Sequence, residues 1–230
     1  METIDPATLI VPLAETPLVS VIVAVYNQER FIGRCLRSLL HQTLSSEKYE
    51  IIVIDDASTD RTSYALELFH DAIRPVASAR TLGLAASVNR GIDVARGSYI
   101  VRVDSDDYVN ANFLHMLSIF LEMNGYVDAV ACDYLLVDDG ENVIERVDCS
   151  ERPIACGIMF RKEQLIDIGL YDESFRCHED RDLRIRFDKK YRVYRLELPL
   201  YRYRRHDSNI TNNAEAMRQH EANLIRKHGL

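Results

Sequence analysis

The sequence predicts an α/β fold, with a mainly parallel central sheet and helices on both faces. The first observation is that runs of β-branched and apolar residues, such as VSVIVAV at 19–25 and IIVI at 51–54, alternate with segments of helical periodicity. The second is that these runs are apolar along their whole length, which is typical of strands covered on both faces. Strands and helices that alternate in this order form parallel sheets.

The first half of the chain is expected to contain four strands separated by helices. The strands are predicted at 19–25, at 51–54, near Val76 and at 98–103. After the first strand, apolar residues between Phe31 and Leu40 recur at helical spacing and form one stripe. This stripe predicts a helix that packs on the sheet.

Capping residues predict where the next helices begin and end. Ser58 or Thr59 is expected to cap the helix that follows the second strand. Gly83 is expected to open a further helix over 84–95, with Gly97 as its C-cap.

The second half of the chain has a different pattern. A fourth helix is expected to start at Asn110 or Asn112. Two strand-like runs, at 129–137 and 142–147, then flank an Asp-Gly pair, which is a hairpin signal. Residues 214–228 have the pattern of a polar amphipathic helix. We therefore expect the second half to be mixed and to extend the sheet.

The composition limits the classes of function. The chain has 230 residues, of which 47% are apolar and 28% charged, as in a globular domain. Its net charge of −8 argues against non-specific binding to nucleic acid or anionic lipid. The five cysteines are odd in number and none forms CxxC, which favours a reduced, cytoplasmic chain. No membrane span is expected, because Pro12, Glu15 and Pro17 interrupt the apolar stretch 9–26.

Clustered carboxylates follow two of the predicted strands. Asp55 and Asp56 end the second strand, and Asp104, Asp106 and Asp107 follow the fourth. In open α/β sheets, ligands bind outside the carboxyl ends of the strands. Carboxylates so close together repel one another, so a cation or hydrogen-bond donors must compensate. Helix capping would also explain an acidic pair, but a single cap does not need three carboxylates.

Several familiar sites are not supported. An EF-hand loop starting at Asp104 would need glycine at its sixth position and glutamate at its twelfth, and it has neither. The turn after the first strand, 26–29, is not GxGxxG, and the sequence contains no Walker A loop. A phosphoacceptor receiver domain normally opens with its acidic pair, whereas here a whole strand–helix unit comes first.

Five segments together resemble the family-two inverting glycosyltransferases, which have the GT-A fold. They are VSVIVAVYNQERFIGRCLRSLLHQT (19–43), IIVIDDASTDRT (51–62), RTLGLAASVNRGIDVARGSYIVRVDSDD (80–107), HEDRDLRIRF (178–187) and YRYRRHDSNIT (201–211). No single motif is specific, but their order and spacing are. The resemblance implies a Rossmann-like sandwich whose sheet is mainly parallel and whose C-terminal half is mixed.

The resemblance also implies a domain organisation. It covers residues 18–212 and divides them into a nucleotide-sugar half, 18–109, and an acceptor half, 110–212. Residues 1–17 are expected to be a lead-in and 213–230 a C-terminal helix.

For the donor, the resemblance implies a nucleotide-diphosphate sugar carrying UDP, GDP or dTDP. Asp56 would hydrogen-bond the base, and a tyrosine ring such as that of Tyr26 can stack on a flat base. The full set implied for the nucleotide is Ala24, Tyr26, Glu29, Asp56, Arg80, Asp104 and Ser105.

The resemblance implies a divalent cation, Mn²⁺ or Mg²⁺, at the DXD sequence Asp104-Ser105-Asp106. Asp106 and His206 would be its ligands, since carboxylate oxygens suit these ions. Asp107 is interpreted as a helix cap in preference to a second ligand.

For catalysis, Asp180 is the candidate general base and Glu179 its neighbour, which would orient it or contact the acceptor. Cys156 and Gly157 are expected to border the acceptor pocket. The chain has no tryptophan and so no QxxRW signature of processive synthases, which favours transfer of single sugars.

The sequence thus predicts a metal-dependent inverting glycosyltransferase in surface polysaccharide or glycan assembly. Its acceptor would be a carbohydrate or a lipid-linked glycan, and nucleic acid is not an expected partner. A homodimer and peripheral contact with the inner face of the membrane are compatible with the sequence. Two alternatives stay open: a non-catalytic module that binds nucleotide sugars, and a sugar nucleotidyltransferase, although the latter class opens with a Gly-rich basic loop that 26–29 lacks.

Overall fold

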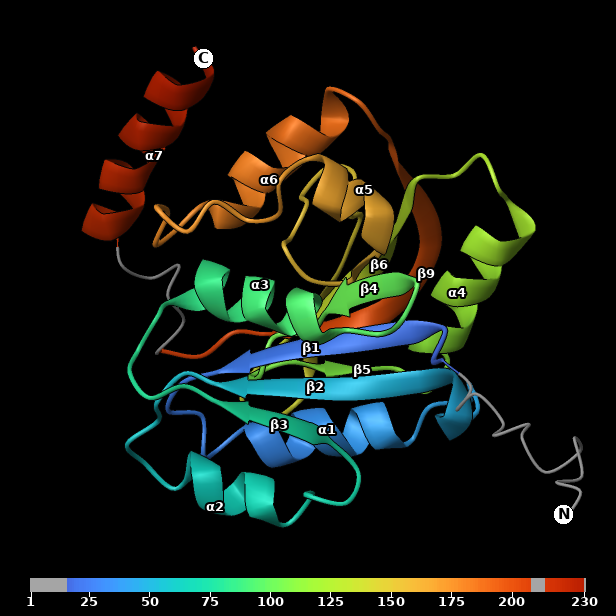
Figure 1. Cartoon of the computed structure of the whole chain (residues 1–230), viewed down its shortest axis with the longest axis vertical. Coiled ribbons are helices and arrows are strands. Elements are labelled where there is room, and N and C mark those ends of the chain that lie inside the picture. Colours follow the sequence, from blue (N-terminus) through green and yellow to red (C-terminus); the bar gives the residue numbers. More distant parts are fainter. Residues whose placement is uncertain (1–15, 208–213, 230) are drawn as a thin grey trace, which may run out of the picture.

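A single sheet runs through the molecule in the computed structural model, which describes residues 16–207 and 214–229 (Figure 1). Within these residues the sheet has nine strands, in the order β3-β2-β1-β4-β8-β6-β9-β5, with β7 paired to β6. The strands are β1 Val19–Val25, β2 Tyr49–Asp55, β3 Arg74–Ala77, β4 Tyr99–Arg102, β5 Tyr108–Val109, β6 Ala129–Val137, β7 Val143–Val147, β8 Ile158–Arg161 and β9 Val193–Arg204.

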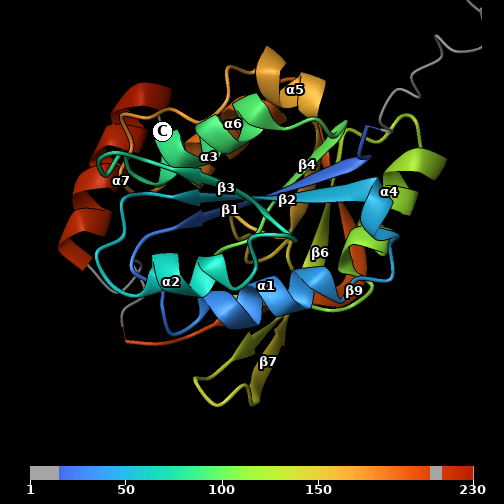
Figure 2. The same cartoon turned by 60° about the horizontal axis from the view of Figure 1, so that its bottom comes forward.

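Helices cover both faces of the sheet. They are α1 Ile32–Leu40, α2 Thr62–Glu67, α3 Leu84–Val94, α4 Phe113–Met123, α5 Lys162–Asp167, α6 Glu179–Asp188 and α7 Ala214–His228, with a short 3-10 turn, η2, at Ser46–Lys48. Figure 2 shows α1 and α2 on one face and α3 on the other. The α/β fold class predicted from the sequence is confirmed.

The sheet changes character between its two halves. Strands β3, β2, β1 and β4 are all parallel to one another, as predicted. Beyond β4 the sheet is mixed, because β8 is antiparallel to both β4 and β6, whereas β9 is parallel to β6. The hairpin predicted from the Asp-Gly pair is β6–β7, which is antiparallel. The second half therefore extends the sheet, as expected.

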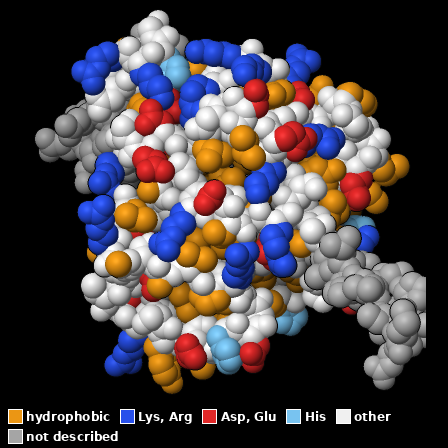
Figure 3. All heavy atoms as spheres, in the orientation of Figure 1, with side chains coloured by type: hydrophobic (Ala, Val, Ile, Leu, Met, Phe, Trp, Pro, Cys, Tyr) orange, Lys and Arg blue, Asp and Glu red, His pale blue; other side chains and the backbone are white. Residues whose placement is uncertain are grey.

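One hydrophobic core joins the two halves. It contains side chains from β1, β2 and β4 as well as from α4, β8 and α6. The largest fully buried side chains include Tyr201, Phe113 and Phe187. On the face in view in Figure 3, the described basic and acidic side chains are interspersed and do not form one broad patch of a single sign.

Two capping predictions are wrong. The N-cap of α2 is Arg61, and neither Ser58 nor Thr59 caps it, because the loop places their side chains against Asn27 instead. The residue after α3 is Ala95, so Gly97 is not its C-cap.

The physical role of Gly97 is a close approach to β1. A Cβ atom at this position would lie 2.6 Å from the backbone nitrogen of Ser20, so only glycine fits. Elsewhere the capping predictions agree with the structure: Gly83 precedes α3 with a φ of 98°, and Asn112 occupies the N-cap position of α4.

Of the predicted lead-in at 1–17, residues 1–15 lie outside the described residues. Residues 208–213 and residue 230 also lie outside them. Among the residues described, no helix has both the length and the apolar character needed to cross a membrane.

Candidate active site

The acidic segments lie at the carboxyl ends of strands close together in the sheet. Asp55 is the last residue of β2, and Asp104 follows β4 by two positions. β1 lies between these two strands and is parallel to both, so the three carboxyl ends share one edge. This is the edge at which ligands of open α/β sheets bind.

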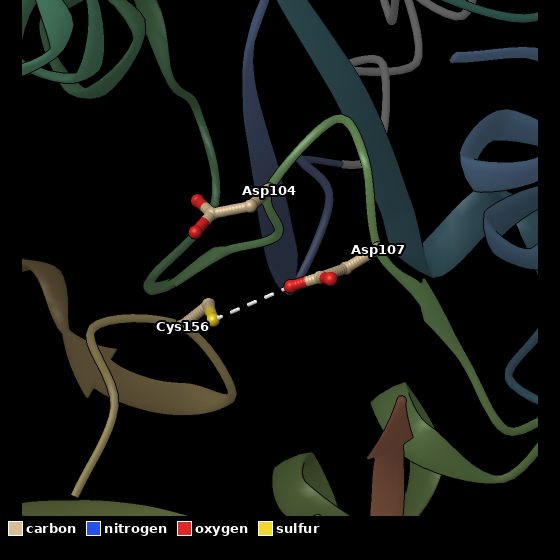
Figure 4. Close-up of side chains that lie close together, drawn as sticks. All are labelled: Asp104, Asp107 and Cys156. Atoms are coloured by element: carbon tan, nitrogen blue, oxygen red, sulfur yellow. Dashed lines mark hydrogen bonds between the residues drawn. The ribbon is translucent and has the colours of Figure 1, made fainter. Parts of the chain in front are cut away.

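The Asp104–Asp107 turn carries three carboxylates. It is closed by a backbone hydrogen bond of 3.1 Å from the Asp107 nitrogen to the Asp104 carbonyl. Ligand atoms of Asp104, Asp107 and Cys156 all lie within 4.8 Å of one another, and the Cys156 thiol points at Asp107 Oδ2, 3.8 Å away (Figure 4). Two oxygens and a sulfur thus face one small space.

Asp107 is anchored to β9. Its Oδ1 accepts the backbone N–H of Arg204 at 2.7 Å, and its Oδ2 accepts the Tyr201 hydroxyl at 2.8 Å. Burial, with the neighbouring carboxylates of Asp106 and Asp104, raises its pKa well above the usual range. The preferred interpretation of Asp107 as a helix cap is wrong, because β5 intervenes before α4 and the carboxylate faces a strand.

Asp106 and His206 come together, although one hundred positions separate them. His206 Nε2 lies 2.9 Å from Asp106 Oδ2, and the imidazole packs on the ring of Phe31 with centroids 4.7 Å apart. Burial raises the pKa of Asp106, with a further contribution from Asp104, and the hydrogen bond to His206 opposes this. The structure therefore brings the two predicted metal ligands into direct contact.

Arg102 is a central residue that the sequence analysis missed. Its side chain is 6% exposed, its Nε donates to Asp104 Oδ1 at 2.6 Å, and its Nη1 donates to Glu179 Oε1 at 3.0 Å. The available signal was a lone arginine inside the otherwise apolar strand SYIVRV. Buried arginines need carboxylate partners, so this residue pointed to an ion-pair network.

Glu179 and Asp180 begin α6. The preceding residue, His178, is left-handed with a φ of 62°, so the chain turns sharply into the helix. Glu179 is buried, and this burial raises its pKa despite the opposing charge of Arg102. Asp180 is half-buried.

Asp180 also lines a small cavity of about 60 Å³. The cavity wall is mainly apolar and is formed by Pro153, Ile154, Ala155, Ile158, Phe160, Tyr171, Asp180, Arg181, Leu183 and Arg184. A more open hollow of about 380 Å³ lies elsewhere, along α1 and β5, and contains none of the predicted site residues.

Cys156 and Gly157 lie beneath the acidic turn. The Cys156 side chain is buried, and burial together with Asp104 and Asp107 raises its pKa. Gly157 has a φ of 74°, and a Cβ there would lie 3.3 Å from the Tyr201 ring. Cys156 thus packs against the carboxylates and Gly157 against Tyr201, and the predicted contact of both residues with an acceptor stays a prediction.

Asp56 fixes the start of α3. Its two oxygens accept the backbone N–H groups of Leu82 and Gly83 at 2.8 and 2.9 Å, and the side chain is buried. It therefore holds the loop that leads into α3 and does not cap α2, the helix that follows it in sequence.

The other residues predicted for the nucleotide lie on the nearby loops. Tyr26, just past β1, is half-exposed, and Glu29 accepts the backbone N–H of Arg61 at 2.7 Å. Ala24 is half-buried in β1, Ser105 is buried in the acidic turn, and Arg80 is exposed. The structure brings Asp104 and Ser105 together in one turn but does not place Arg80 against any other predicted site residue.

Asn27 joins these loops and was also missed. It is left-handed with a φ of 52°, and its Oδ1 accepts the Thr59 N–H at 2.8 Å. It thus ties the loop after β1 to the loop after β2. An asparagine two positions after the end of a buried strand was the available signal, since asparagine tolerates this conformation better than most residues.

A second group of possible ligand atoms is formed by Asp133, Asp148 and Cys149. Arg195 already donates twice to Asp133, at 2.8 Å each, and also lies 2.6 Å from Asp148. The charge of this cluster is thus balanced by arginine, so we do not assign it a cation.

The sequence comparison identifies the family. Residues 20–192 match the sequence model described as Glycosyl transferase family 2. The chain belongs to this family. It is 32% identical over 220 residues to the uncharacterized glycosyltransferase EpsJ of Bacillus subtilis, covering 85% of this chain and 63% of EpsJ. It is also 32% identical to the putative glycosyltransferase EpsE of the same organism, covering 82% of this chain and 73% of EpsE.

The chain spans only part of most of the curated relatives it matches, for example 63% of EpsJ and 34% of EpsH. Among solved structures it resembles S. aureus TarS 1–349 in complex with UDP-GlcNAc, with a TM-score of 0.71 at 23% identity over 90% of this chain and 66% of that one. It also resembles the mannosyltransferase PcManGT of Pyrobaculum calidifontis in complex with GDP-Man and Mn²⁺, with a TM-score of 0.73 at 21% identity over 92% of this chain and 64% of that one. The family-2 chain thus has the GT-A fold.

Proposed function

We propose that this family-2 protein transfers a single sugar from a nucleotide-diphosphate sugar to an acceptor hydroxyl, with inversion at the anomeric carbon. One observation carries the proposal: Arg102 joins the Asp104–Asp107 turn directly to the start of α6, where Glu179 and Asp180 lie. A group that stabilises a leaving diphosphate and a base that deprotonates an alcohol must be neighbours in such a reaction.

The donor set of the acidic turn fits a divalent cation such as Mn²⁺ or Mg²⁺. These ions prefer carboxylate oxygens, and Asp104 and Asp107 bring such oxygens within 4.8 Å of one another, with Asp106 in the same turn. Burial and neighbouring carboxylates raise the pKa of Asp106 and of Asp107, and a cation bound beside them would favour their charged forms. When bound, the cation would stabilise the negative charge that develops on the departing diphosphate. We assign Asp106 and His206 to this site, with Asp104 and Asp107 beside them.

On the acceptor side, Asp180 acts as the general base. It removes the proton from the acceptor hydroxyl as the oxygen attacks the anomeric carbon, and the nucleoside diphosphate leaves from the opposite face. A positioned base of this kind contributes roughly 10²–10⁴-fold in rate. Asp180 is half-buried beside a small apolar cavity, which is compatible with a base that must be shielded yet reachable.

On the donor side, Tyr26 and Asp56 bind the base, and the other predicted residues contact the ribose and diphosphate. Since Asp56 already accepts two backbone N–H groups, a base would use its remaining lone pairs. We propose the same division into a nucleotide-sugar half, 18–109, and an acceptor half, 110–212.

The acceptor class is proposed from the relatives. A protein named poly(ribitol-phosphate) beta-glucosyltransferase, from Bacillus spizizenii, is 39% identical over 100 residues, which cover 42% of this chain and 16% of that protein. We propose a carbohydrate or lipid-linked acceptor in surface polysaccharide assembly, on the cytoplasmic side of the membrane.

The experiment is a panel of sugar nucleotides assayed for release of nucleoside diphosphate with and without Mn²⁺. In the active combination, Asp180→Asn is expected to lower transfer at least about 100-fold, because it removes the base, while nucleotide affinity changes less than about twofold. Asp188→Asn is the matched control, because Asp188 lies on the same helix in an exposed pair with Arg184. Unchanged transfer by Asp180→Asn would remove this residue from the base role.

The same panel separates the alternatives. Tight nucleotide-sugar binding without turnover on any acceptor would favour a non-catalytic binding module. Release of pyrophosphate from a nucleoside triphosphate would favour a sugar nucleotidyltransferase.

A further inference from the structure

We propose that Arg102 is a positioning residue that sets the place of the base helix α6 relative to the Asp104–Asp107 turn. This rests on the proposed function, because Asp180 is the group whose place it sets.

The geometry joins three elements through one side chain. Arg102 is the last residue of β4, the central strand at which the parallel and mixed halves of the sheet meet. Its Nε holds Asp104, the first residue of the acidic turn, and its Nη1 holds Glu179, the first residue of α6. All three side chains are largely shielded from water, with exposures of 6%, 24% and 7% for Arg102, Asp104 and Glu179.

An arginine suits this place for a chemical reason. Its planar guanidinium presents several N–H donors in a fixed fork, so one side chain can hold two carboxylates in a defined relation. A lysine ammonium keeps the charge but has no such fork, and its shorter reach favours one partner over the other. The relation between Asp104 and Glu179 therefore depends on the guanidinium group and not on positive charge alone.

The position of Glu179 determines that of Asp180. The two residues are adjacent in the first turn of α6, directly after the left-handed His178. Tyr171 is a further neighbour of Arg102. The side-chain amide of Asn89 hydrogen-bonds both the N–H and the carbonyl of Tyr171. Burial raises the pKa of the Tyr171 hydroxyl to about 12, and the charge of Arg102 opposes this shift. Among the described residues, Arg102 is the cationic side chain that pairs with Glu179.

A separate anchor lies at the end of the first turn of α6. Asp182 is fully buried and is paired with Arg186 of α6 and with Lys227 and His228 of α7, at 2.6–2.8 Å. Because this anchor does not involve Arg102, α6 is expected to stay folded when Arg102 is replaced. Only the residues that precede Asp182 should loosen.

The test compares Arg102→Lys with Arg195→Lys. Arg195 is a matched control because it also holds a buried carboxylate, Asp133, in the acceptor half but makes no described contact with α6 or the acidic turn. In the unliganded protein, Arg102→Lys is expected to speed hydrogen exchange of the amides at 182–184 at least tenfold, because their hydrogen bonds are accepted by the carbonyls of 178–180. Arg195→Lys should leave these amides unchanged, even if it lowers the melting temperature.

The catalytic readout is the split between kcat and KM. Arg102→Lys is expected to lower kcat for transfer at least tenfold, with a smaller change in donor KM, and to raise the fraction of donor lost to water. Glu179→Gln weakens the same Arg102–Glu179 contact by removing the charge of the carboxylate. The double variant Arg102→Lys/Glu179→Gln should therefore have a kcat no lower than that of the slower single variant. If Arg102→Lys does not fold, Glu179→Gln alone tests whether the Arg102–Glu179 contact positions α6.

Two outcomes would overturn the proposal. One is hydrogen exchange at 182–184 equal to wild type in both Arg102→Lys and Glu179→Gln, and the other is a kcat loss in Arg195→Lys as large as in Arg102→Lys. If the wild-type protein turns over no donor at all, the proposed function fails, and the exchange measurement still decides whether Arg102 holds α6.

Discussion

The two halves of the sheet differ in the balance of apolar packing and buried ion pairs that stabilises them. In the nucleotide-sugar half, β1, β2 and β4 are almost wholly buried and mainly apolar, although Glu50 of β2 pairs with Arg96. In the acceptor half, buried carboxylates pair with cations distant in sequence. Asp133 binds Arg195, and Asp182 binds Lys227 and His228.

The difference bears on the ligand that we propose for each half. Apolar strands that end together give a rigid edge on which a nucleotide can be held. Ion pairs between distant segments, by contrast, fix orientation, because each charge accepts only a partner in the right place. The candidate site lies at the boundary, where Arg102 of the first half meets Glu179 of the second.

The largest expected effect is on the free energy of unfolding, and it tests whether the two halves share one core. Phe187 of α6 is fully buried and packs edge-to-face on Phe160, with ring centroids 5.1 Å apart. Phe187→Ala is expected to cost about 3–5 kcal/mol, because it leaves a cavity in a continuous core. Urea unfolding followed by far- and near-UV circular dichroism should remain one transition at a lower midpoint. Two separate transitions, with only one of them shifted, would show that the halves fold independently.

A smaller effect is expected in the nucleotide-sugar half. Gly97→Ala places a Cβ 2.6 Å from the Ser20 nitrogen and 2.7 Å from the Val19 carbonyl carbon. Because these obstacles are backbone atoms, the cost should be about 2–3 kcal/mol, in the upper part of the usual range for overpacking. Gly125→Ala is the matched control, since the structure shows no atom within 4 Å of the added methyl group. Equal melting temperatures for the two variants would contradict the close approach.

The smallest effect concerns a buried ion pair of the acceptor half, and it depends on pH. Hydrogen bonds from Arg195 lower the pKa of Asp133 to about 2. A carboxyl with a lowered folded-state pKa stabilises the fold above its unfolded pKa of about 4 and loses this contribution as the pH falls towards 2. Asp133→Asn is therefore expected to cost on the order of 2 kcal/mol at pH 7.

The pH dependence separates this ion pair from a packing defect. The difference in free energy of unfolding between wild type and Asp133→Asn should shrink as the pH falls from about 4 to about 2, as measured by urea titrations at each pH. A difference that stays constant over this range would show that Asp133 contributes by packing and not by its charge.

Much of the nucleotide-sugar half could be predicted from local sequence. Continuous apolar runs predicted β1, β2 and β4 because strands buried on both faces need apolar side chains at every position. The amphipathic pattern at 214–228 likewise predicted α7, with the bounds that the structure has. Helix caps were less predictable from local sequence. Ser58 and Thr59 hydrogen-bond Asn27 of another loop, and Gly97 is required by its close approach to Ser20 of β1.

The sequence by itself determined the fold class, the family resemblance and the presence of carboxylates at the strand ends, because these depend on residue type and spacing along the chain. Only the tertiary structure decided which charges meet: Asp106 with His206, Asp107 with Tyr201, and Arg102 with both Asp104 and Glu179. The physical reason is that a buried charge is stabilised by whichever partner the folded chain brings within hydrogen-bonding distance. That partner can be a hundred residues away, where no local pattern records it.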